Sequence, residues 1–272
     1  MPIHDPRRPE CRYKDLFEAI PNSLGSFGYL LRLRMRIQKT QPFVHIQKTW
    51  VDSPSCFIDE LNAACSKERG HDFVDGVAIS EQGGVVITGK FVNSLPSGTA
   101  ASKYCYKQFY PTLMVDGDDY LEVIDYIWRW DADWFWVTQV FPMMSWGWMR
   151  FLTGSQYLRS DMYKIFNDRV MLLVAPLTRN QELVIQDIEV PLNKSAEWIR
   201  LHLQACPSIE IGKIKIRRPG KEVGVPIWIC PVVGTASPLM PMDAGKMYMV
   251  RTMHPQPVAI CALSQKLRFE RA

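Results

Sequence analysis

The sequence predicts an α+β fold in which helices cover one face of a mainly antiparallel sheet. Three observations lead to this fold class. Apolar and charged residues alternate over 30–37, two apolar runs flank a turn over 73–92, and a strand pattern leads into a helix pattern over 182–203. The 272 residues, of which 47% are hydrophobic, suffice for one large domain or two smaller ones with a buried core.

The first predicted strand covers residues 30–37. Its side chains divide into an apolar face and a charged face, which is typical of a strand with one buried side. The two faces carry Leu31, Leu33, Met35 and Ile37 on one side and Arg32, Arg34 and Arg36 on the other. Gly25 and Gly28 precede the strand and allow both a tight turn and the close approach of another group to the backbone.

A helix and a hairpin are expected next. Ser53 or Ser55 can cap a helix that runs through 56–69 and stops at Gly70. The strands of the hairpin and the polar loop after it are expected at 73–80, 85–92 and 93–103.

The second half of the sequence predicts a strand, a helix and two more strands. The strand over 182–192 leads to a helix that begins at Asn193 or Ser195. One face of this helix is apolar and consists of Leu192, Ala196, Ile199 and Leu203. Strands follow at 213–218 and 225–233, and the second is apolar enough to be buried on both faces.

An aromatic segment over 120–141 contains four tryptophans within nine residues. In a strand these tryptophans share one face with Tyr126, because all five positions are even-numbered. An apolar face of this size must be buried by the protein or covered by a ligand or a membrane. Packing in the core and a wall for a large apolar ligand both remain open.

Several function classes are disfavoured. A net charge of +4 gives no dense basic face, so we expect no nucleic-acid partner. The sequence contains no Walker A loop, GxGxxG, HExxH or GxSxG motif, and its five histidines are far apart, so no metal site is expected. Seven scattered cysteines indicate reduced thiols in a cytosol-facing protein. We expect neither a signal peptide nor a transmembrane helix, which needs about 20 mostly apolar residues.

Four segments, in order, resemble a known family. Residues 15–37 are similar to the closing segment of the flavin-binding domain of PCMH-type FAD-linked oxidases. Three later segments resemble the Δ24-sterol reductase branch, also called the 24-dehydrocholesterol reductase branch. These are the aromatic segment 120–136, the strand and helix at 182–203, and 225–232 followed by 238–249.

The resemblance implies a domain organisation. Residues 1–45 are expected to be the C-terminal remnant of a PCMH-type FAD-binding domain, and 46–250 a substrate-binding α+β cap domain with a mainly antiparallel sheet covered by helices. Residues 251–272 are expected to be a divergent tail. In the family a long region that holds the FAD pyrophosphate precedes the matched part, so this protein resembles a fragment truncated at both ends.

The resemblance also implies an activity. It is that of a FAD-dependent oxidoreductase that reduces a C=C bond in the side chain of a sterol by hydride transfer through the flavin, with NADPH as electron donor. Family members associate with the endoplasmic reticulum membrane, which implies peripheral membrane association or a cytoplasmic location for this protein. Two other functions remain open: a non-catalytic fragment or apolar-ligand-binding module without flavin, and a FAD-linked oxidase of a polar alcohol.

The candidate cofactor-binding residues are Gly25, Ser26, Phe27 and Gly28, whose backbone N–H groups can reach flavin or phosphate oxygens. A plain tight turn is the alternative for this segment.

Three residues are candidate catalytic groups. Tyr126 can donate the proton that alkene reduction requires, or it can be a core tyrosine. Arg129 can stabilise an anionic reduced flavin, or it can join a surface ion network. Asp187 interrupts an apolar strand and can orient a neighbour or cap the next helix.

Five tryptophans are candidate substrate-binding residues. A sterol is a rigid apolar plate that suits a cavity lined by aromatic rings, whereas packing in the core is the alternative role. The tryptophans are Trp128, Trp130, Trp134, Trp136 and Trp228, and Cys230 shares a strand face with the last of them.

Overall fold

The computed structural model describes residues 13–20, 25–34, 37–104, 107–115, 117–131, 146–153, 187–205, 227–234, 243 and 245–252. The protein separates into two units. The smaller unit comprises 1–39 with 232–248, and the larger comprises 40–231 with 249–272. The larger unit carries most of the sheet and every residue of the two sites described below.

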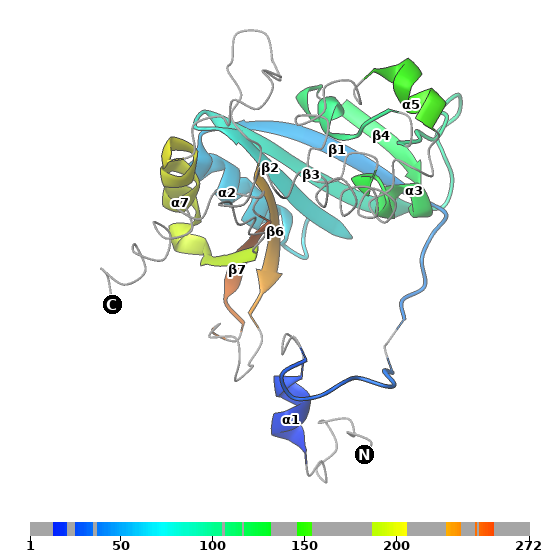
Figure 1. The fold of residues 1–272 in the computed structure, drawn as a ribbon. Helices are drawn as coiled ribbons and strands as arrows, with labels where there is room; N and C mark the ends of the chain where they lie inside the picture. Colours follow the sequence, from blue (N-terminus) through cyan, green and yellow to red (C-terminus); the bar gives the residue numbers. More distant parts are fainter. Residues whose placement is uncertain are drawn as a thin grey trace, which may run out of the picture. The chain divides into compact units, whose positions relative to one another are not determined.

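The described part confirms the predicted α+β class (Figure 1). Its sheet has seven strands in the order β4-β1-β3-β2-β6-β7-β5, and the pairs around β1 and β2 are antiparallel. The strands are β1 (Phe43–Asp52), β2 (Phe73–Ser80), β3 (Gly83–Val92), β4 (Gly117–Glu122), β5 (Asp187–Pro191), β6 (Ile227–Val233) and β7 (Met247–Thr252).

The described helices are short. They are α1 (Lys14–Ala19), α2 (Pro54–Ala64), the 3-10 helix η1 (Tyr110–Met114), α3 (Val123–Ile127), α5 (Gly147–Thr153) and α7 (Leu192–Ala205). None of the described helices is long and apolar enough to cross a membrane.

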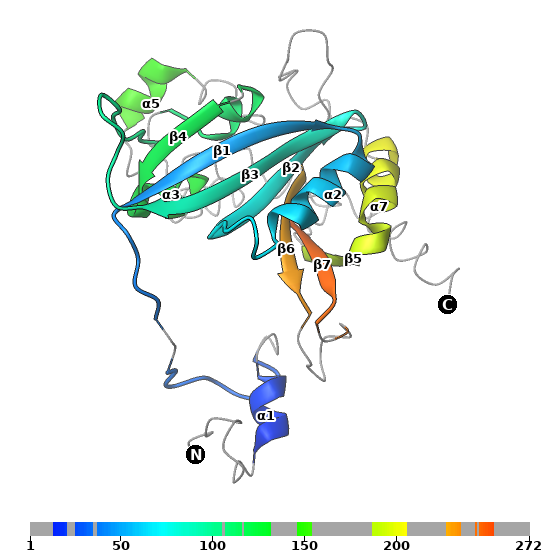
Figure 2. The same ribbon diagram turned by 180° about the vertical axis from the view of Figure 1, so that it is seen from behind.

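The two faces of the sheet carry different layers. Alternate residues of β1, β2 and β3 form what we call the core face, where Val44, Val77 and Val85 pack with Phe109 and Leu121. We call the opposite face the α2 face, because α2 lies against it on the near side in Figure 2 and on the far side in Figure 1.

The α2 face explains two glycines of the hairpin. A Cβ on Gly76 would lie 2.8 Å from the Phe57 ring, and one on Gly84 would lie 3.0 Å from the same ring. Phe57 is fully buried between the helix and the sheet. A larger residue at Gly76 would push α2 away from the strands, and one at Gly84 would clash first with the backbone of β2, at 2.5 Å from Val77 O.

The predicted hairpin is confirmed. β2 and β3 pair antiparallel from Phe73 opposite Gly89 to Ser80 opposite Gly83. The turn itself contains only Glu81 and Gln82, because both glycines of the Glu-Gln-Gly-Gly sequence belong to β3.

The predicted helix after the first strand is also confirmed, with a different end. Ser53 is the cap, and its Oγ accepts a hydrogen bond from Cys56 N at 3.3 Å. The helix ends at Ala64 rather than at Gly70, and turns continue to Gly70, whose φ is +64°. The predicted helix in the second half is confirmed as α7, which begins at Leu192.

The predicted strand over 30–37 is wrong for the residues that the structure describes. Residues 28–34 and 37–40 carry no strand, and Leu31 and Ile37 are 96% and 97% exposed. The first strand is β1, in which Val44 and Ile46 point to the core and His45 and Gln47 to the other face, and which pairs with β3 and β4. Alternation marks a segment that suits a sheet, but a strand also needs neighbours for its backbone groups.

The aromatic segment is not one strand. β4 ends at Glu122, and α3 begins at Val123. The strand predicted over 213–218 lies outside the described residues. In β6, Ile227 and Ile229 are buried while Trp228 and Cys230 are only partly buried, so the prediction of burial on both faces holds for one face.

Gly83 opens β3 at φ +144°, and a Cβ there would lie 2.0 Å from Val51 O. We expect Gly83→Ala to lower the free energy of unfolding by about 3 kcal/mol, because backbone strain and a backbone clash add. Gly117→Ala is the matched control, since φ is +139° there but no described atom lies within 4 Å. Urea denaturation measures both variants, and equal losses would contradict the steric explanation.

Candidate functional site

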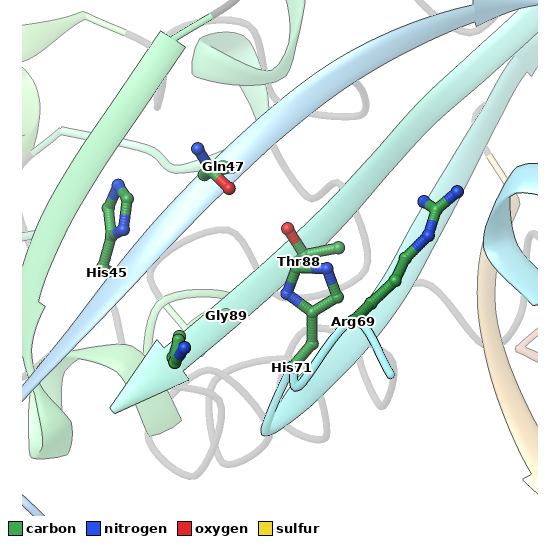
Figure 3. A pocket seen from close by; sticks show the side chains of 7 residues that line it. His45, Gln47, Arg69, His71, Thr88 and Gly89 are labelled. Carbon is green, nitrogen blue, oxygen red and sulfur yellow. The ribbon is translucent and has the colours of Figure 1, made fainter. Parts of the chain in front are cut away.

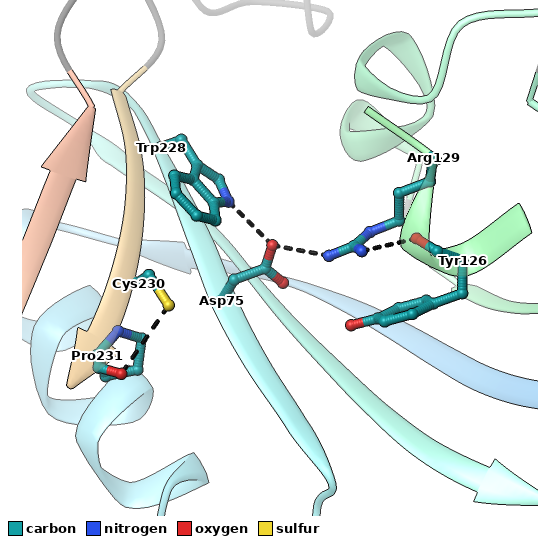
Figure 4. A network of polar contacts seen from close by, with 6 residues as sticks. All are labelled: Asp75, Tyr126, Arg129, Trp228, Cys230 and Pro231. Carbon is teal, nitrogen blue, oxygen red and sulfur yellow. Dashed lines mark hydrogen bonds and ion pairs between the residues drawn. The ribbon is translucent and has the colours of Figure 1, made fainter. Parts of the chain in front are cut away.

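The candidate site is built around the carboxylate of Asp75, in the middle of β2 on the core face (Figure 4). The side chain is almost completely buried, with 5% of the residue exposed. Its Oδ2 accepts hydrogen bonds from Arg129 Nη2 and from Trp228 Nε1, both at 2.9 Å. One oxygen atom thus joins β2, the turn after α3, and β6.

The sheet brings Trp228 to this carboxylate. β2 pairs antiparallel with β6, and Val77 lies opposite Trp228. Asp75 is two residues before Val77 and therefore points to the same face of the sheet. A tryptophan can reach diagonally across a strand pair, which explains how the indole N–H donates to Asp75.

The turn after α3 places Arg129 beside Asp75. The helix ends at Ile127, and the N–H of Arg129 bonds back to Tyr126 O at 3.3 Å. The Nη1 of the same arginine donates to Tyr126 O at 2.9 Å. The guanidinium is therefore held by a backbone carbonyl on one side and by the Asp75 carboxylate on the other.

Aromatic rings enclose the arginine. Its guanidinium carbon lies 3.9 Å from the centroid of the Tyr126 ring and 5.6 Å from the centroids of Phe109 and Trp130. The last two rings meet edge to face at 4.8 Å. A cation over ring faces is attracted electrostatically, and the attraction is greater where water is excluded.

Both side chains of the Arg129–Asp75 ion pair are buried. The side chains of Arg129 and Asp75 are 8% and 7% exposed. A buried pair adds little compared with an apolar replacement, but loss of one partner leaves an uncompensated charge in a poorly solvated place. The second carboxylate oxygen, Asp75 Oδ1, and Arg129 Nε have no hydrogen-bond partner within the described part of the protein.

The Tyr126 hydroxyl is protonated at neutral pH. Burial raises the pKa of this phenol well above its ordinary value, and the negative charge of Asp75 raises it further. The positive charge of Arg129 opposes both effects without cancelling them. Burial, and then Asp75, likewise raise the pKa of the Cys230 thiol, which keeps it protonated.

The structure assembles part of the predicted site. Tyr126, Arg129, Trp130 and Trp228 lie together around Asp75. Trp128 does not join them, because it ends the helical turn and is 49% exposed. Trp128 and Trp130 would share one face only in a strand, whereas 123–130 is helix and turn. Trp134 and Trp136 lie outside the described residues.

The remaining predicted residues lie elsewhere. Asp187 is the first residue of β5, which is separated from β2 by β6 and β7 in the sheet, and only its backbone is described. Residues 25–28 form a tight turn in which Gly28 N donates to Gly25 O at 3.3 Å. All four residues of this turn are exposed, and they belong to the smaller unit.

Asp75 itself was not among the residues singled out by sequence. It carries the same signal that drew attention to Asp187, a carboxylate within an apolar strand that needs a partner when buried. The sequence Phe-Val-Asp-Gly-Val-Ala-Ile-Ser at 73–80 shows it plainly. Its two partners lie 54 and 153 positions away in the sequence, so no local pattern identifies them.

Comparison of the sequence and structure with protein-family models, with curated proteins and with solved structures finds no match. Among the described residues, no group of three His, Cys, Asp or Glu side chains is arranged to hold a metal ion.

We expect Asp75→Asn to lower the free energy of unfolding by about 3 to 5 kcal/mol, because Arg129 then stays buried without a counter-charge. Asp118→Asn is the control, since that side chain is 54% exposed beside His45 and should cost under about 1 kcal/mol. Urea denaturation at pH 7 measures both. Similar small losses would mean that Arg129 does not depend on Asp75.

Cys230 should react slowly with iodoacetamide at pH 8. Burial, reinforced by Asp75, disfavours its thiolate, and the thiolate is the reactive form. Cys56 is exposed and provides the internal comparison. Peptide mass spectrometry of the native protein should show at least about tenfold slower alkylation of Cys230 than of Cys56. Equal rates would contradict the burial of this part of β6.

Proposed function

We propose that this protein forms the substrate-binding part of a FAD-dependent oxidoreductase of the Δ24-sterol reductase type, which reduces a C=C bond in the side chain of a sterol. One observation carries the proposal. Tyr126, Arg129, Trp130 and Trp228, singled out from segments that resemble this family, meet around one buried carboxylate. The α+β architecture with an antiparallel sheet agrees with the cap domain that the resemblance implies.

The glycine turn fits a role in holding FAD. Gly25 and Gly28 have φ of +82° and +138°, and the space where a Cβ would stand is open at both. A ligand can therefore approach the backbone of Gly25, Ser26, Phe27 and Gly28 closely. FAD, when bound and reduced by NADPH, the proposed electron donor, would supply the hydride for the reaction.

The protein's own residues would supply the proton. Alkene reduction needs a proton at one carbon, and the Tyr126 hydroxyl remains protonated until the substrate draws it away. Arg129, 3.9 Å from the centre of that ring, would stabilise the phenolate left behind. Asp75 fixes the guanidinium in place, and so acts as a positioning residue in this scheme.

The surrounding indoles and the Phe109 ring would exclude water and contact the apolar skeleton of the substrate. A rigid hydrocarbon plate gains affinity from such rings, whereas a polyol would need many polar contacts. Several apolar side chains around α5, including Trp146, Trp148 and Phe151, are exposed, which supports the proposed peripheral association with a membrane.

Tyr126→Phe tests the proton donor. With FAD and NADPH added, we expect the protein to reduce a Δ24-sterol, and we expect the variant to lose kcat about 100-fold or more at similar KM. The matched control is Tyr104→Phe, because Tyr104 is also a buried phenol, with a pKa raised by burial and a hydrogen bond to Asp119. Equal losses in both variants would reject the role of Tyr126.

The flavin is tested separately. Addition of FAD to the purified protein should change the flavin absorbance spectrum, and replacement of both Gly25 and Gly28 by Val should abolish the change. A spectrum identical to free FAD in the parent protein would reject this function and favour an apolar-ligand-binding module without flavin.

A further inference from the structure

A polar pocket opens on the α2 face, on the opposite face of the sheet from Asp75. Its volume is about 230 Å³, and it lies over β1 and β3 beside the connection from α2 to β2 (Figure 3). The side chains that matter for its chemistry are His45, Gln47, Arg69, His71, Thr88 and Lys90. The proposed oxidoreductase function uses none of them.

The strand register places four of these side chains together. In the β1–β3 ladder, His45 lies opposite Lys90 and Gln47 lies opposite Thr88. Directly opposed residues of an antiparallel pair point to the same face, so the four form one patch. Asp75 pairs with Ile87, whose side chain points to the other face.

The connection after α2 is anchored to the same strand. Asp72 N donates to Gly89 O at 2.9 Å, and Asp72 Oδ2 accepts from Phe91 N at 2.8 Å. This double contact holds His71 beside the edge of β3. Arg69 is fixed by a hydrogen-bonded ion pair with Glu60 of α2. Both backbone and side-chain hydrogen bonds therefore fix the positions of His71 and Arg69 at the pocket.

The side chains that line the pocket are hydrogen-bond donors. Each of the six side chains carries an N–H or O–H donor, two of them are cationic, and none is a carboxylate. The neighbouring carboxylates each have partners of their own. Glu60 binds Arg69, Asp72 binds the backbone of β3, and Asp118 accepts from Gln47 Nε2 at 3.2 Å and lies 3.2 Å from His45 Nε2.

The charges around His71 also favour an anion. Burial lowers the pKa of this imidazole most, followed by the positive charges of Arg69 and Lys90. The negative charges of Asp72 and Glu60 act in the opposite direction and have smaller effects. The two cations therefore outweigh the two carboxylates at the point where a ligand would contact His71.

We propose that this pocket binds the phosphoryl group of an anionic ligand. A tetrahedral phosphate presents acceptor oxygens in several directions, which suits a pocket whose donors come from three segments: β1, β3 and the α2–β2 connection. Lys90 supplies the main charge, because the Nη groups of Arg69 are bonded to Glu60. Thr88, His71 and the second N–H of Gln47 supply neutral donors. A planar carboxylate has two oxygens and would leave several of these donors without an acceptor.

Inorganic phosphate is the first probe, added to the whole protein at constant ionic strength with chloride as the matched salt. The signals of the His71 ring in a ¹H–¹⁵N spectrum should shift saturably, and the pKa of His71 should rise because a nearby anion favours imidazolium. His202, which stacks on Trp198 in α7, should not respond. A His71 response to phosphate no larger than that to chloride would overturn the proposal.

Two variants test the assignment. Lys90→Gln should weaken phosphate binding about tenfold, since one charge-assisted hydrogen bond is lost from an exposed strand position that folding does not require. Lys107→Gln, at another exposed lysine, should bind like the parent protein. Equal affinities for both variants would overturn the proposal.

The source of the phosphoryl group is distinguished by two further probes. Adenosine 2′-monophosphate represents a soluble nucleotide, and phosphatidylcholine vesicles with or without phosphatidic acid represent a lipid headgroup. Whichever source is the ligand should bind more tightly than inorganic phosphate and lose affinity in Lys90→Gln. Failure of every phosphoryl probe would overturn this proposal and leave the oxidoreductase proposal untouched, because the Tyr126 assay does not involve this pocket.

Discussion

The larger unit depends on a single buried carboxylate that accepts two hydrogen bonds. Asp75 Oδ2 receives an N–H from a guanidinium and an N–H from an indole, and these donors come from segments that are far apart in sequence. Burial of a charge is costly, so a carboxylate in the middle of an apolar strand is tolerated only if partners arrive. β6 must therefore add to β2 in the observed register, and the turn after α3 must close over the core face.

The ion pair between Asp75 and Arg129 also determines which groups face Tyr126. The Arg129 guanidinium is paired with a carboxylate and enclosed by aromatic rings, so it is shielded from water, unlike a surface arginine. It remains a fixed positive charge against the face of Tyr126. This combination of an apolar wall, a protonated phenol and a fixed cation is the feature that gives the proposed reduction its physical basis.

The sequence predicted the local elements well where each pattern is complete within a short segment. The hairpin of β2 and β3, the Ser53 cap of α2 and the helix α7 depend on neighbouring residues, and all three are confirmed. The strand expected over 30–37 failed, because alternation does not reveal whether a neighbouring strand exists. β1 alternates less strictly, since Lys48 falls on its core face, but it has two neighbouring strands and forms the strand instead.

The site was only partly predictable for the same reason. Tyr126, Arg129 and Trp130 are close in sequence, and an aromatic segment with one arginine draws attention by itself. Their spatial partner Asp75 lies in a different segment, and only the tertiary fold pairs the two. The even spacing of Trp128 and Trp130 places them on one face only in a strand, and the sequence pattern does not reveal that these residues form the end of α3 and its closing turn.

The β2–β3 hairpin contributes side chains to both faces of the sheet. Its odd-numbered members near the middle, such as Asp75 and Ile87, point to the core, while Thr88 and Lys90 reach the polar pocket. Because side chains alternate strictly along a strand, one additional residue within β3 would move every later side chain to the opposite surface. An insertion before Val85 would therefore turn Lys90 toward the core and Ile87 toward the α2 face, so a change of length in β3 disrupts more contacts than a substitution at an exposed position such as Lys90.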